Sequence, residues 1–346
     1  MKNIFVKLLL EWFETNKRDL PWKETSDPYK IWISEVILQQ TRVKQGYDYY
    51  LRFIACFPTV KELAQASEDE VMKLWQGLGY YSRARNLHAA AKQIIEKGDF
   101  PSTYEEVLAL KGVGEYTAAA ICSFAYNLPY AVVDGNVYRV LSRFFGVENP
   151  IDTTAGRRYF QALAQELLPL DNPANYNQAI MDFGAIQCVP KGPACMNCIF
   201  HEKCFAYGKG QVGELPVKKN RVKVRERYFN YLYIHSDEQI YFTKRGEGDI
   251  WQNLYDFPLI ETERPIELDE LLKDDKFKDI AMGIKFEEVK KIGSTQIHML
   301  SHQRLHINFY EIYIQGKLTG NQQVSKKELS NYAVPKPIEK FLKNNL

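Results

Sequence analysis

The sequence predicts a mainly α-helical N-terminal region followed by a small α+β domain. Residues 1 to about 207 carry apolar side chains at helical spacing, whereas 228–235, 239–244 and 305–314 alternate or cluster β-branched and aromatic residues, as strands do. Between them, residues 208–227 (GKGQVGELPVKKNRVKVRER) are rich in glycine, Lys and Arg, which indicates a basic linker. A chain of 346 residues is long enough for two or three domains.

Local signals mark several helix boundaries. Asp27 precedes Pro28, which is the pattern of an N-cap followed by a first-turn proline. Ser102 and Glu105 have the spacing of a capping box, and the segment PKPIEKFLKNN starts at a proline and predicts a closing helix. Periodic apolar positions predict helices over 28–45, 68–76, 82–97, 103–109, 115–126 and 136–145.

Composition and charge exclude some classes of protein. The 45 basic and 43 acidic residues nearly balance, so any nucleic-acid-binding surface must be local. No apolar run approaches membrane-spanning length, which predicts a protein without a membrane partner. The N-terminal segment carries Glu11, Trp12 and Glu14 where a secretory signal needs an apolar core, so we expect a cytoplasmic protein with reduced thiols.

Four cysteines with the spacing C-x6-C-x2-C-x5-C indicate a shared metal ligand. Two disulfides would need an oxidising compartment, and structural zinc usually uses two C-x2-C steps across a longer gap. One C-x2-C flanked by wider steps favours a 4Fe-4S cluster over zinc. The remaining Cys56 and Cys122 lie in apolar helical patterns and are expected to be small buried hydrophobes. The four predicted ligands are Cys188, Cys195, Cys198 and Cys204.

Two glycine-containing hairpins indicate contact with a nucleic acid. In LKGVGEYT, Gly112 and Gly114 allow a tight turn that leaves backbone N–H groups pointing outward at a helix start, where a phosphate is favoured. Read alone, this segment is a helix C-cap and turn, and its L-x-G-x-G pattern is weak evidence of DNA contact. The second hairpin, QGLGYY at 76–81, is followed by cationic residues that suit phosphate contact. It supplies the candidates Leu78, Tyr80, Arg83 and Arg85.

Two carboxyl groups, those of Glu35 and Asp134, lie in sequence contexts that suit a protonated acid and an ionised carboxylate. Glu35 shares a helical stripe with Ile31 and Leu38, so a low-dielectric site would raise its pKa and let it act as a general acid; the alternative is a solvated glutamate near Lys30. Asp134 precedes a predicted helix, where an N-capping carboxylate accepts backbone hydrogen bonds and is expected to stay ionised at low pKa. One protonated and one ionised carboxyl group suit cleavage of a glycosidic bond, here between deoxyribose and a base.

With these motifs in order, the chain resembles the helix-hairpin-helix DNA glycosylases of the endonuclease III superfamily, and within them the MutY-type adenine DNA glycosylases. The resemblance implies a six-helix barrel at about 28–133, an iron–sulfur domain from 1–27 and 134–207, and a Nudix-like domain at 228–346. It is carried by RDLPW (18–22), SEVILQQTRV (34–43), GLGYYSRARNLHAA (77–90), VDGNVYRVLSR (133–143) and the cysteine loop.

Tyr116 separates two branches of this superfamily. Bifunctional relatives place a lysine here, whose amine forms a Schiff base with the sugar before strand cleavage. A phenol cannot form that imine, so the resemblance implies a monofunctional enzyme that leaves an abasic site. A bifunctional glycosylase/lyase and a non-catalytic iron–sulfur DNA-binding protein remain the two alternatives.

The resemblance also assigns roles to individual residues. Glu35 would protonate adenine N7 and then handle the attacking water, while Asp134 would stabilise the cationic sugar. Tyr116 and Asn136 would support these two groups by hydrogen bonding. Arg18, Trp22 and Gln178 would line the pocket for the flipped adenine, and Gln40, Thr41, Leu78 and Tyr80 would wedge into the duplex.

The C-terminal domain resembles a Nudix-like domain that recognises 8-oxoguanine opposite the adenine. The acidic metal-binding box of Nudix hydrolases is absent, so pyrophosphate hydrolysis is not expected. The lesion-reading loop, usually Phe-Ser-His, is Leu300-Ser301-His302 here; Ser301 and His302 can still hydrogen-bond to the lesion, but the aromatic contact is missing. The implied partner is double-stranded DNA with an A:8-oxoguanine or A:G mispair, bound by a monomer.

Overall fold

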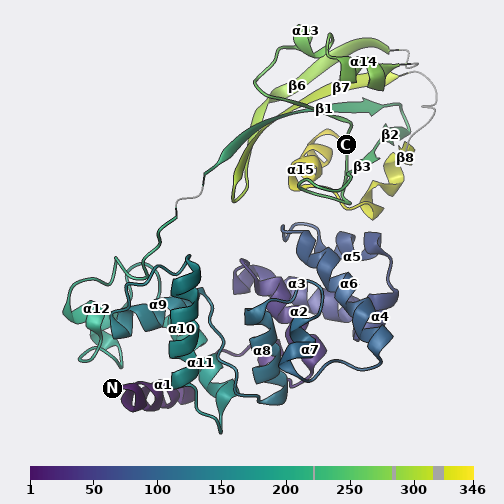
Figure 1. The fold of residues 1–346 in the computed structure, drawn as a ribbon. Helices are drawn as coiled ribbons and strands as arrows, with labels where there is room; N and C mark the ends of the chain where they lie inside the picture. Colours follow the sequence, from purple (N-terminus) through teal and green to yellow (C-terminus); the bar gives the residue numbers. More distant parts are fainter. Residues whose placement is uncertain (221–222, 283–285, 315–322) are drawn as a thin grey trace. The chain divides into compact units, whose positions relative to one another are not determined.

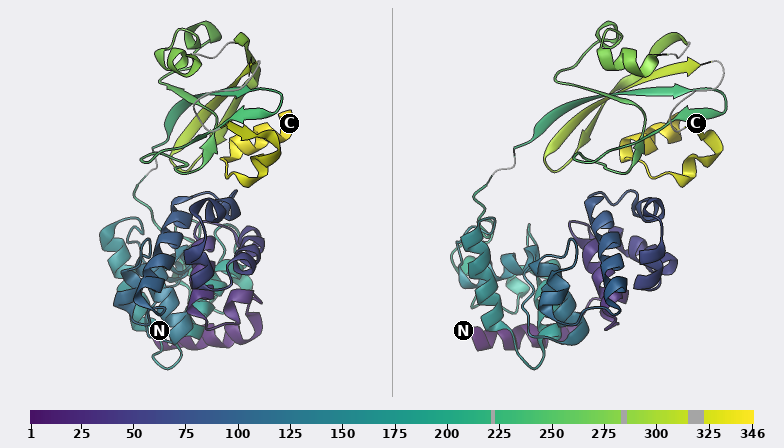
Figure 2. Two further views of the ribbon diagram at one scale, coloured as in Figure 1. Left: turned by 90° about the vertical axis from the view of Figure 1, so that its right-hand side faces the viewer. Right: turned by 45° about the vertical axis from the view of Figure 1, so that its right-hand side comes forward.

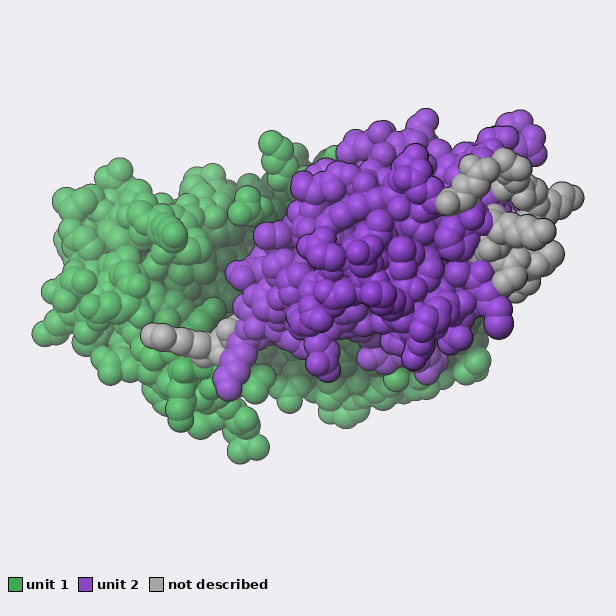
Figure 3. Space-filling model, turned by 90° about the horizontal axis from the view of Figure 1, so that it is seen from above, with its two compact units in different colours: residues 1–65, 86–221 green, residues 66–85, 222–346 purple. Residues whose placement is uncertain are grey.

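The structure is a computed structural model that describes residues 1–220, 223–282, 286–314 and 323–346. The chain divides into two compact units, one formed by residues 1–65 with 86–221 and the other by 66–85 with 222–346 (Figure 1 and Figure 3). The predicted basic linker includes Arg221 and Val222, which lie outside the described residues. No helix in the described parts of the chain is long and apolar enough to cross a membrane.

In its described residues the first unit consists of helices joined by turns and loops, with no strand. Its N-terminal helix α1 buries Phe5, Leu9 and Phe13, which recur at every fourth position, against a core that includes Phe144 and Phe183. The helices are α1 (Lys2–Asn16), α2 (Pro28–Leu38), α3 (Val43–Cys56), α4 (Val60–Gln65), α6 (Ser82–Lys97), α7 (Tyr104–Leu108), α8 (Glu115–Tyr126), α9 (Gly135–Phe145), α10 (Thr154–Leu167), α11 (Pro173–Ile186) and α12 (Phe205–Gly208), with 3-10 turns η1 (Pro21–Lys23) and η2 (Cys195–Asn197).

Most predicted helices are confirmed, and three expectations are corrected. The helix expected over 28–45 is two helices, because Gln40 takes a left-handed conformation with φ 55° and the chain turns between α2 and α3. The N-cap expected at Ser102 is Thr103, whose hydroxyl accepts a hydrogen bond from the N–H of Glu106. Cys56 is exposed at the end of α3, so only Cys122 is the buried hydrophobe that the pattern predicted.

The second unit is built on a mixed sheet, as the strand patterns predicted. Its central strand β1 runs parallel to β7, with register from Arg225↔Gln303 to His235↔Tyr313. The strand order is β6-β7-β1-β2-β8, with β5 paired to β1 and with β3 and β4 forming a separate pair. The strands are β1 (Arg225–His235), β2 (Gln239–Tyr241), β3 (Thr243–Lys244), β4 (Tyr255–Asp256), β5 (Leu259–Thr262), β6 (Phe286–Met299), β7 (Gln303–Ile314) and β8 (Gln323–Ser325).

Helices cover both faces of this sheet (Figure 2). Leu232 of β1 packs in one core with Leu271 of α13 (Leu268–Leu271) and Phe277 of α14 (Asp275–Ala281). Its neighbour Tyr233 points to the other face and packs on Phe341 of α15 (Lys336–Asn345), the predicted closing helix. This alternation follows from the two-residue period of a strand. The unit also contains η3 (Lys326–Asn331) and the helix α5 (Glu68–Trp75).

Candidate active site

Glu35 lies on α2, a helix whose start is fixed locally. Asp27 caps it by accepting a hydrogen bond from the Tyr29 N–H over 2.9 Å, and Pro28 occupies the first turn, as predicted. Glu35 is only 7% exposed. Its Oε2 accepts a hydrogen bond from the Tyr116 hydroxyl over 2.7 Å. The structure therefore favours the buried acid over the solvated glutamate that the sequence left open.

Burial, with a smaller contribution from the charge of Asp134, raises the pKa of Glu35 to about 7. The Tyr116 hydrogen bond and the positive charge of Lys23 act in the opposite direction, because they stabilise the ionised form. The carboxyl group can thus hold a proton near neutral pH. That is the requirement for a general acid.

Asp134 caps α9 as predicted, and its carboxylate is held by three donors. Oδ1 accepts hydrogen bonds from the N–H groups of Asn136 and Val137, each over 2.8 Å, and Oδ2 accepts one from Asn136 Nδ2 over 2.7 Å. Burial nevertheless raises the pKa of Asp134 above its usual value, against the effect of these donors. The low pKa expected from the capping pattern is therefore wrong in direction, because the pattern did not reveal how little water reaches the group.

One large cavity brings together most of the predicted site. Glu35 and Tyr116 line it with Asp134, although they come from three different helical segments. The turn at 39–42, which the apolar periodicity did not predict, also lines this cavity. The other predicted residues among its walls are Arg18, Trp22, Gln40, Thr41, Gly112, Gly114, Asn136 and Gln178.

Three residues of the cavity wall form a charged cluster, of which the sequence indicated only Arg18. Asp182, fully buried, accepts hydrogen bonds from Arg18 Nε over 2.7 Å and from Lys23 Nζ over 2.6 Å. Burial lowers the pKa of Lys23, while the neighbouring Asp182 raises it. The available signal for Asp182 was its position four residues after Gln178, which places both on the same face of α11.

The first glycine hairpin requires glycine for a steric reason. Gly112 has φ +74°, and a Cβ there would lie 2.5 Å from Cβ of Asn86. Gly114 then forms the N-cap of α8 without a side chain. The amide groups at the start of α8 therefore lie at the mouth of the cavity, where Gly112 and Gly114 both form part of the wall.

The second hairpin belongs to the other unit. Tyr80 is 44% exposed with φ 48°, whereas Leu78 is only 8% exposed. Arg83 stacks its guanidinium over the ring of Tyr80 and donates to the carbonyl of Gly79. Arg85 donates to the carbonyl of Gln252 over 2.9 Å. Both cations thus have partners within the chain, and phosphate binding by them stays a prediction.

Ser301 and His302 lie exposed at the turn between β6 and β7. The turn is closed by a hydrogen bond of 2.8 Å from the Leu300 N–H to the Gln303 carbonyl. The hydroxyl groups of Ser301 and Tyr80, both in the second unit, share a short hydrogen bond. Two groups predicted to contact DNA from distant parts of the sequence are therefore neighbours.

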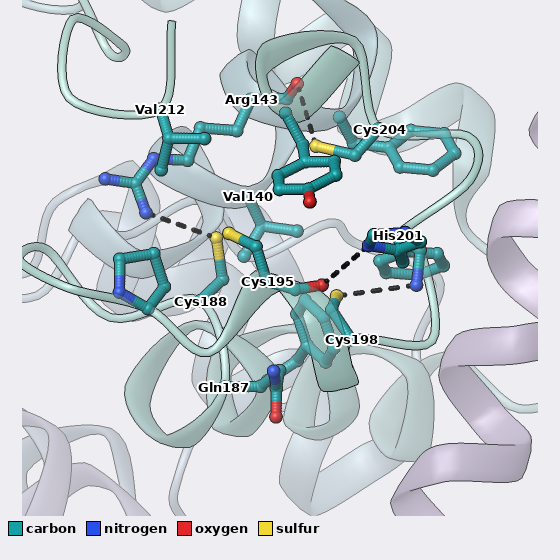
Figure 4. Close-up of a pocket in the computed structure, with 14 residues that line it drawn as sticks. Val140, Arg143, Gln187, Cys188, Cys195, Cys198, His201, Cys204 and Val212 are labelled. Atoms are coloured by element: carbon teal, nitrogen blue, oxygen red, sulfur yellow. Dashed lines mark hydrogen bonds between the residues drawn. The ribbon is translucent and has the colours of Figure 1, made fainter. Parts of the chain in front are cut away.

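The four cysteines of the C-x6-C-x2-C-x5-C motif line one pocket (Figure 4). Arg143, almost fully buried, donates from Nη1 to Cys188 Sγ over 3.4 Å and to the Val189 carbonyl over 2.8 Å. The N–H of Phe200 lies 3.4 Å from Cys198 Sγ. Across the described residues, no three His, Cys, Asp or Glu side chains converge tightly enough to hold a single metal ion.

Comparisons with known proteins agree with this fold and cavity. The family model described as "HhH-GPD superfamily base excision DNA repair protein" matches residues 33–169, and a NUDIX domain model matches 230–344. A solved thermostable thymine-DNA glycosylase is 31% identical with a TM-score of 0.56, covering 60% of this chain and 97% of its own. The fold and the site thus define a base-excision DNA glycosylase of the helix-hairpin-helix class.

Curated relatives narrow the class further. The adenine DNA glycosylase of Buchnera aphidicola subsp. Schizaphis graminum is 34% identical over 98% of both chains. The mouse adenine DNA glycosylase is 38% identical over 74% of this chain and 51% of its own length. The chain belongs to the adenine DNA glycosylases, the DNA N-glycosylases that remove adenine in base excision repair.

Proposed function

We propose that the protein removes adenine placed opposite 8-oxoguanine or guanine in duplex DNA, with Glu35 as general acid and Asp134 as the anion that stabilises the sugar. The observation that carries this proposal is the buried Glu35, which accepts a hydrogen bond from Tyr116 in the same cavity as Asp134. Such a cavity combines one carboxyl group that keeps its proton near neutral pH with a second that is held by N–H donors.

In the proposed reaction, the Glu35 carboxyl group transfers its proton to N7 of the flipped adenine. The bond between N9 and C1′ then breaks, and its electron pair leaves with the base. The Asp134 carboxylate opposes the positive charge that develops on C1′ and O4′. Water adds to C1′ and gives its proton to the Glu35 carboxylate, which regenerates the acid and leaves an abasic site.

Tyr116 orients Glu35 and does not attack the sugar. Burial and the neighbouring carboxyl groups raise the pKa of Tyr116 well above its usual value, so the phenol keeps its proton and remains a donor. The nearby amine of Lys23 donates to Asp182 over 2.6 Å, and this ion pair opposes the lowering of the Lys23 pKa by burial and holds the amine away from the role of nucleophile. This arrangement supports a monofunctional enzyme.

The remaining predicted residues have roles around this centre. In the proposal, Gly112 and Gly114 hold a phosphate, Leu78 and Tyr80 enter the duplex, and Arg83 and Arg85 remain candidates for the backbone. The residues proposed to bind the adenine or its partner strand from the cavity are Arg18, Trp22, Gln40, Thr41 and Gln178, and those proposed to read 8-oxoguanine are Ser301 and His302.

The proposed domain division is a barrel at about 28–133, an iron–sulfur domain from 1–27 and 134–207, and a lesion-reading domain at 228–346. The packing of α1 on a core built from α9, α10 and α11 supports joining the N-terminus to the second of these. All groups proposed for catalysis line one cavity of one chain, which supports action as a monomer. Because the substrate is DNA, we place the activity in the cytoplasm, at the nucleoid if the cell is bacterial.

We also propose that Cys188, Cys195, Cys198 and Cys204 hold a 4Fe-4S cluster. Their thiols surround one pocket, as thiolates of a cubane do when each binds a different iron. A single zinc ion usually takes its thiolates from two C-x2-C steps across a longer gap, whereas these cysteines contain one C-x2-C step flanked by wider steps. The cluster would stabilise a loop that carries the exposed Lys191 and Lys203, which suit contact with a phosphate backbone.

One assay tests the function. The protein is incubated with duplexes carrying A opposite 8-oxoguanine, A opposite G, or thymine glycol, and free base and strand breaks are measured with and without alkali. Adenine release with breaks only after alkali is expected. Strand breaks without alkali, release of thymine glycol, or tight binding without release of any base would each overturn the proposal.

A further inference from the structure

Helix α5 and the residue that follows it are joined to the C-terminal part of their own unit by a group of polar contacts. Lys73 Nζ donates to the Tyr332 carbonyl over 2.9 Å, and the Val334 N–H lies 3.3 Å from Gln76 Oε1. The side chain of Asn253 donates to Glu68 through a short hydrogen bond. Segments more than 150 residues apart in the sequence are therefore held together by side chains from one eight-residue helix.

Asp69 adds two further contacts to this group. Its Oδ1 accepts a charged hydrogen bond from Lys244 Nζ over 2.6 Å, and its Oδ2 accepts a hydrogen bond from the Tyr255 hydroxyl over 3.1 Å. Lys244 and Tyr255 face each other on paired strands β3 and β4, and the Lys244 amine also lies over the Tyr255 ring at 5.3 Å. We call Asp69, Lys244 and Tyr255 the α5 latch.

Asp69 of the latch and the hairpin of Tyr80 lie on one continuous stretch of chain. Residues 66–85 begin with α5 and continue into the turn where Tyr80 shares its hydrogen bond with Ser301. The C-terminal part of the unit thus contacts this stretch at two places: the β3–β4 pair contacts α5 at the latch, and the β6–β7 turn contacts Tyr80 through Ser301. If the packing of β3 and β4 on α5 changed, Ser301 and His302 would move relative to the hairpin.

A helix N-terminus alone does not account for Asp69. The acidic residues of the first turn, Glu68, Asp69 and Glu70, all favour the helix dipole, and Glu70 completes a capping box with Ser67. That local role would leave the Asp69 carboxylate in water. Instead it has two partners from strands that lie more than 170 positions away in the sequence.

We propose that Asp69 is a positioning residue for lesion discrimination: through Lys244 and Tyr255 it fixes the 8-oxoguanine-reading turn against the Tyr80 hairpin. This inference rests on the proposed function, because it assumes that Ser301 and His302 read the base opposite adenine. None of the three latch residues is among those that line the adenine cavity, and none belongs to the turn. Its loss should therefore weaken the preference for A:8-oxoG over A:G while leaving the chemical step unchanged.

The test uses charge reversal and its repair in the full-length protein. Lys244→Asp and Asp69→Lys each place like charges at the latch, and the double variant Asp69→Lys/Lys244→Asp restores an opposite pair. Lys278→Asp is the matched control, since Lys278 forms an exposed ion pair with Asp275 over 2.7 Å in α14. Tyr255→Phe removes one hydrogen bond and keeps the ring, so it tests the latch with little risk to folding.

The readouts are kcat/KM for A:8-oxoG and A:G duplexes and the single-turnover rate at saturating enzyme. Each single reversal is expected to lower the ratio of the two kcat/KM values by about two- to fivefold, the range that an exposed ion pair supports. The loss should appear in KM for A:8-oxoG, with the single-turnover rate unchanged. The double variant should recover the ratio, and Lys278→Asp should not change it.

Several results would overturn the inference. An unchanged ratio in both reversals and in Tyr255→Phe would do so, as would an equal loss on both duplexes or a failure of the double variant to recover the ratio while its thermal unfolding matches wild type. If the wild-type protein shows no preference for A:8-oxoG, the proposed function itself has failed and the inference falls with it. If that preference is present and the latch variants keep it, only the inference has failed.

Discussion

Tyr116 donates a hydrogen bond to Glu35 over 2.7 Å, although the two residues are 81 positions apart in the sequence. The hydrogen bond links the first turn of α8, after the first glycine hairpin, to the interior of α2. It affects both the orientation and the pKa of Glu35. It orients the carboxyl group, and it moderates the rise in pKa that burial causes. Four predictions test the active site and a fifth tests the cysteine loop.

Replacing Glu35 by Gln should reduce the single-turnover rate of adenine release by about 10²- to 10⁴-fold, the range for loss of a general acid. Gln keeps the size of the side chain but has no acidic proton, so DNA binding should persist. Base release measured by chromatography and affinity measured by gel shift separate the two effects. Retention of near wild-type release would show that another group is the acid.

Replacing Asp134 by Asn should abolish adenine release and preserve the fold, because Asn is also a good N-cap and can accept the bonds from Asn136 and Val137. The negative charge opposite the sugar is lost, together with the hydrogen bond that Oδ2 accepts from Asn136 Nδ2. Thr153→Asn at the N-cap of α10 is the control for a cap change outside the cavity. Binding to an A:8-oxoG duplex should survive in both variants. An active Asp134→Asn enzyme would contradict the role assigned to this carboxylate.

The rate should fall as pH rises through about 7, because Glu35 must be protonated to act and burial sets its pKa at about 7. Above that pH we expect a decline approaching about tenfold per pH unit. Tyr116→Phe removes a donor that stabilises ionised Glu35, so the pKa rises and the falling limb moves to higher pH. Single-turnover rates between pH 5 and 9 measure this. A limb that stays in place or moves to lower pH would argue against the Tyr116–Glu35 coupling.

Tyr116→Lys should give the enzyme lyase activity. Its amine would attack C1′ and form an imine with the opened sugar, after which loss of a C2′ proton expels the 3′ phosphate. Borohydride should then trap a covalent complex, and strand breaks should appear without alkali. Tyr116→Phe, which has no amine, is the control. If the lysine variant excises adenine but gives neither a trapped complex nor strand breaks, the residue at position 116 does not determine whether the enzyme is monofunctional or bifunctional.

Replacing Cys198 by Ser should lower the iron and labile sulfide content of the purified protein and lower its thermal unfolding temperature, because a ligand of the proposed cluster is lost. Cys56→Ser is the matched control, since Cys56 is exposed and lies outside the pocket of the four cysteines. Iron and sulfide assays and a melting curve are the measurements. Zinc in place of iron, or no change in Cys198→Ser, would contradict the cluster assignment.

Local chemistry made much of the fold predictable. Asp27 and Asp134 could be recognised as N-caps because a cap depends on the next two or three residues, and the strands of the C-terminal domain followed from their alternation. Where two local signals competed, the sequence was less informative. The N-cap of α7 is Thr103, one residue after the predicted Ser102. The turn at Gln40 interrupts an apolar pattern that continues through it.

The sequence by itself determined which groups the site contains: an acid candidate at Glu35, an anion candidate at Asp134, a phenol at position 116 in place of an amine, and four closely spaced thiols. Only the tertiary structure determined the pKa of these groups and the residues that lie next to them. Burial raised the pKa of both carboxyl groups. Folding also brought Asp182, on a distant helix, into an ion pair with Lys23. Desolvation and ion pairing depend on neighbours that folding brings from distant positions, so no local pattern could reveal them.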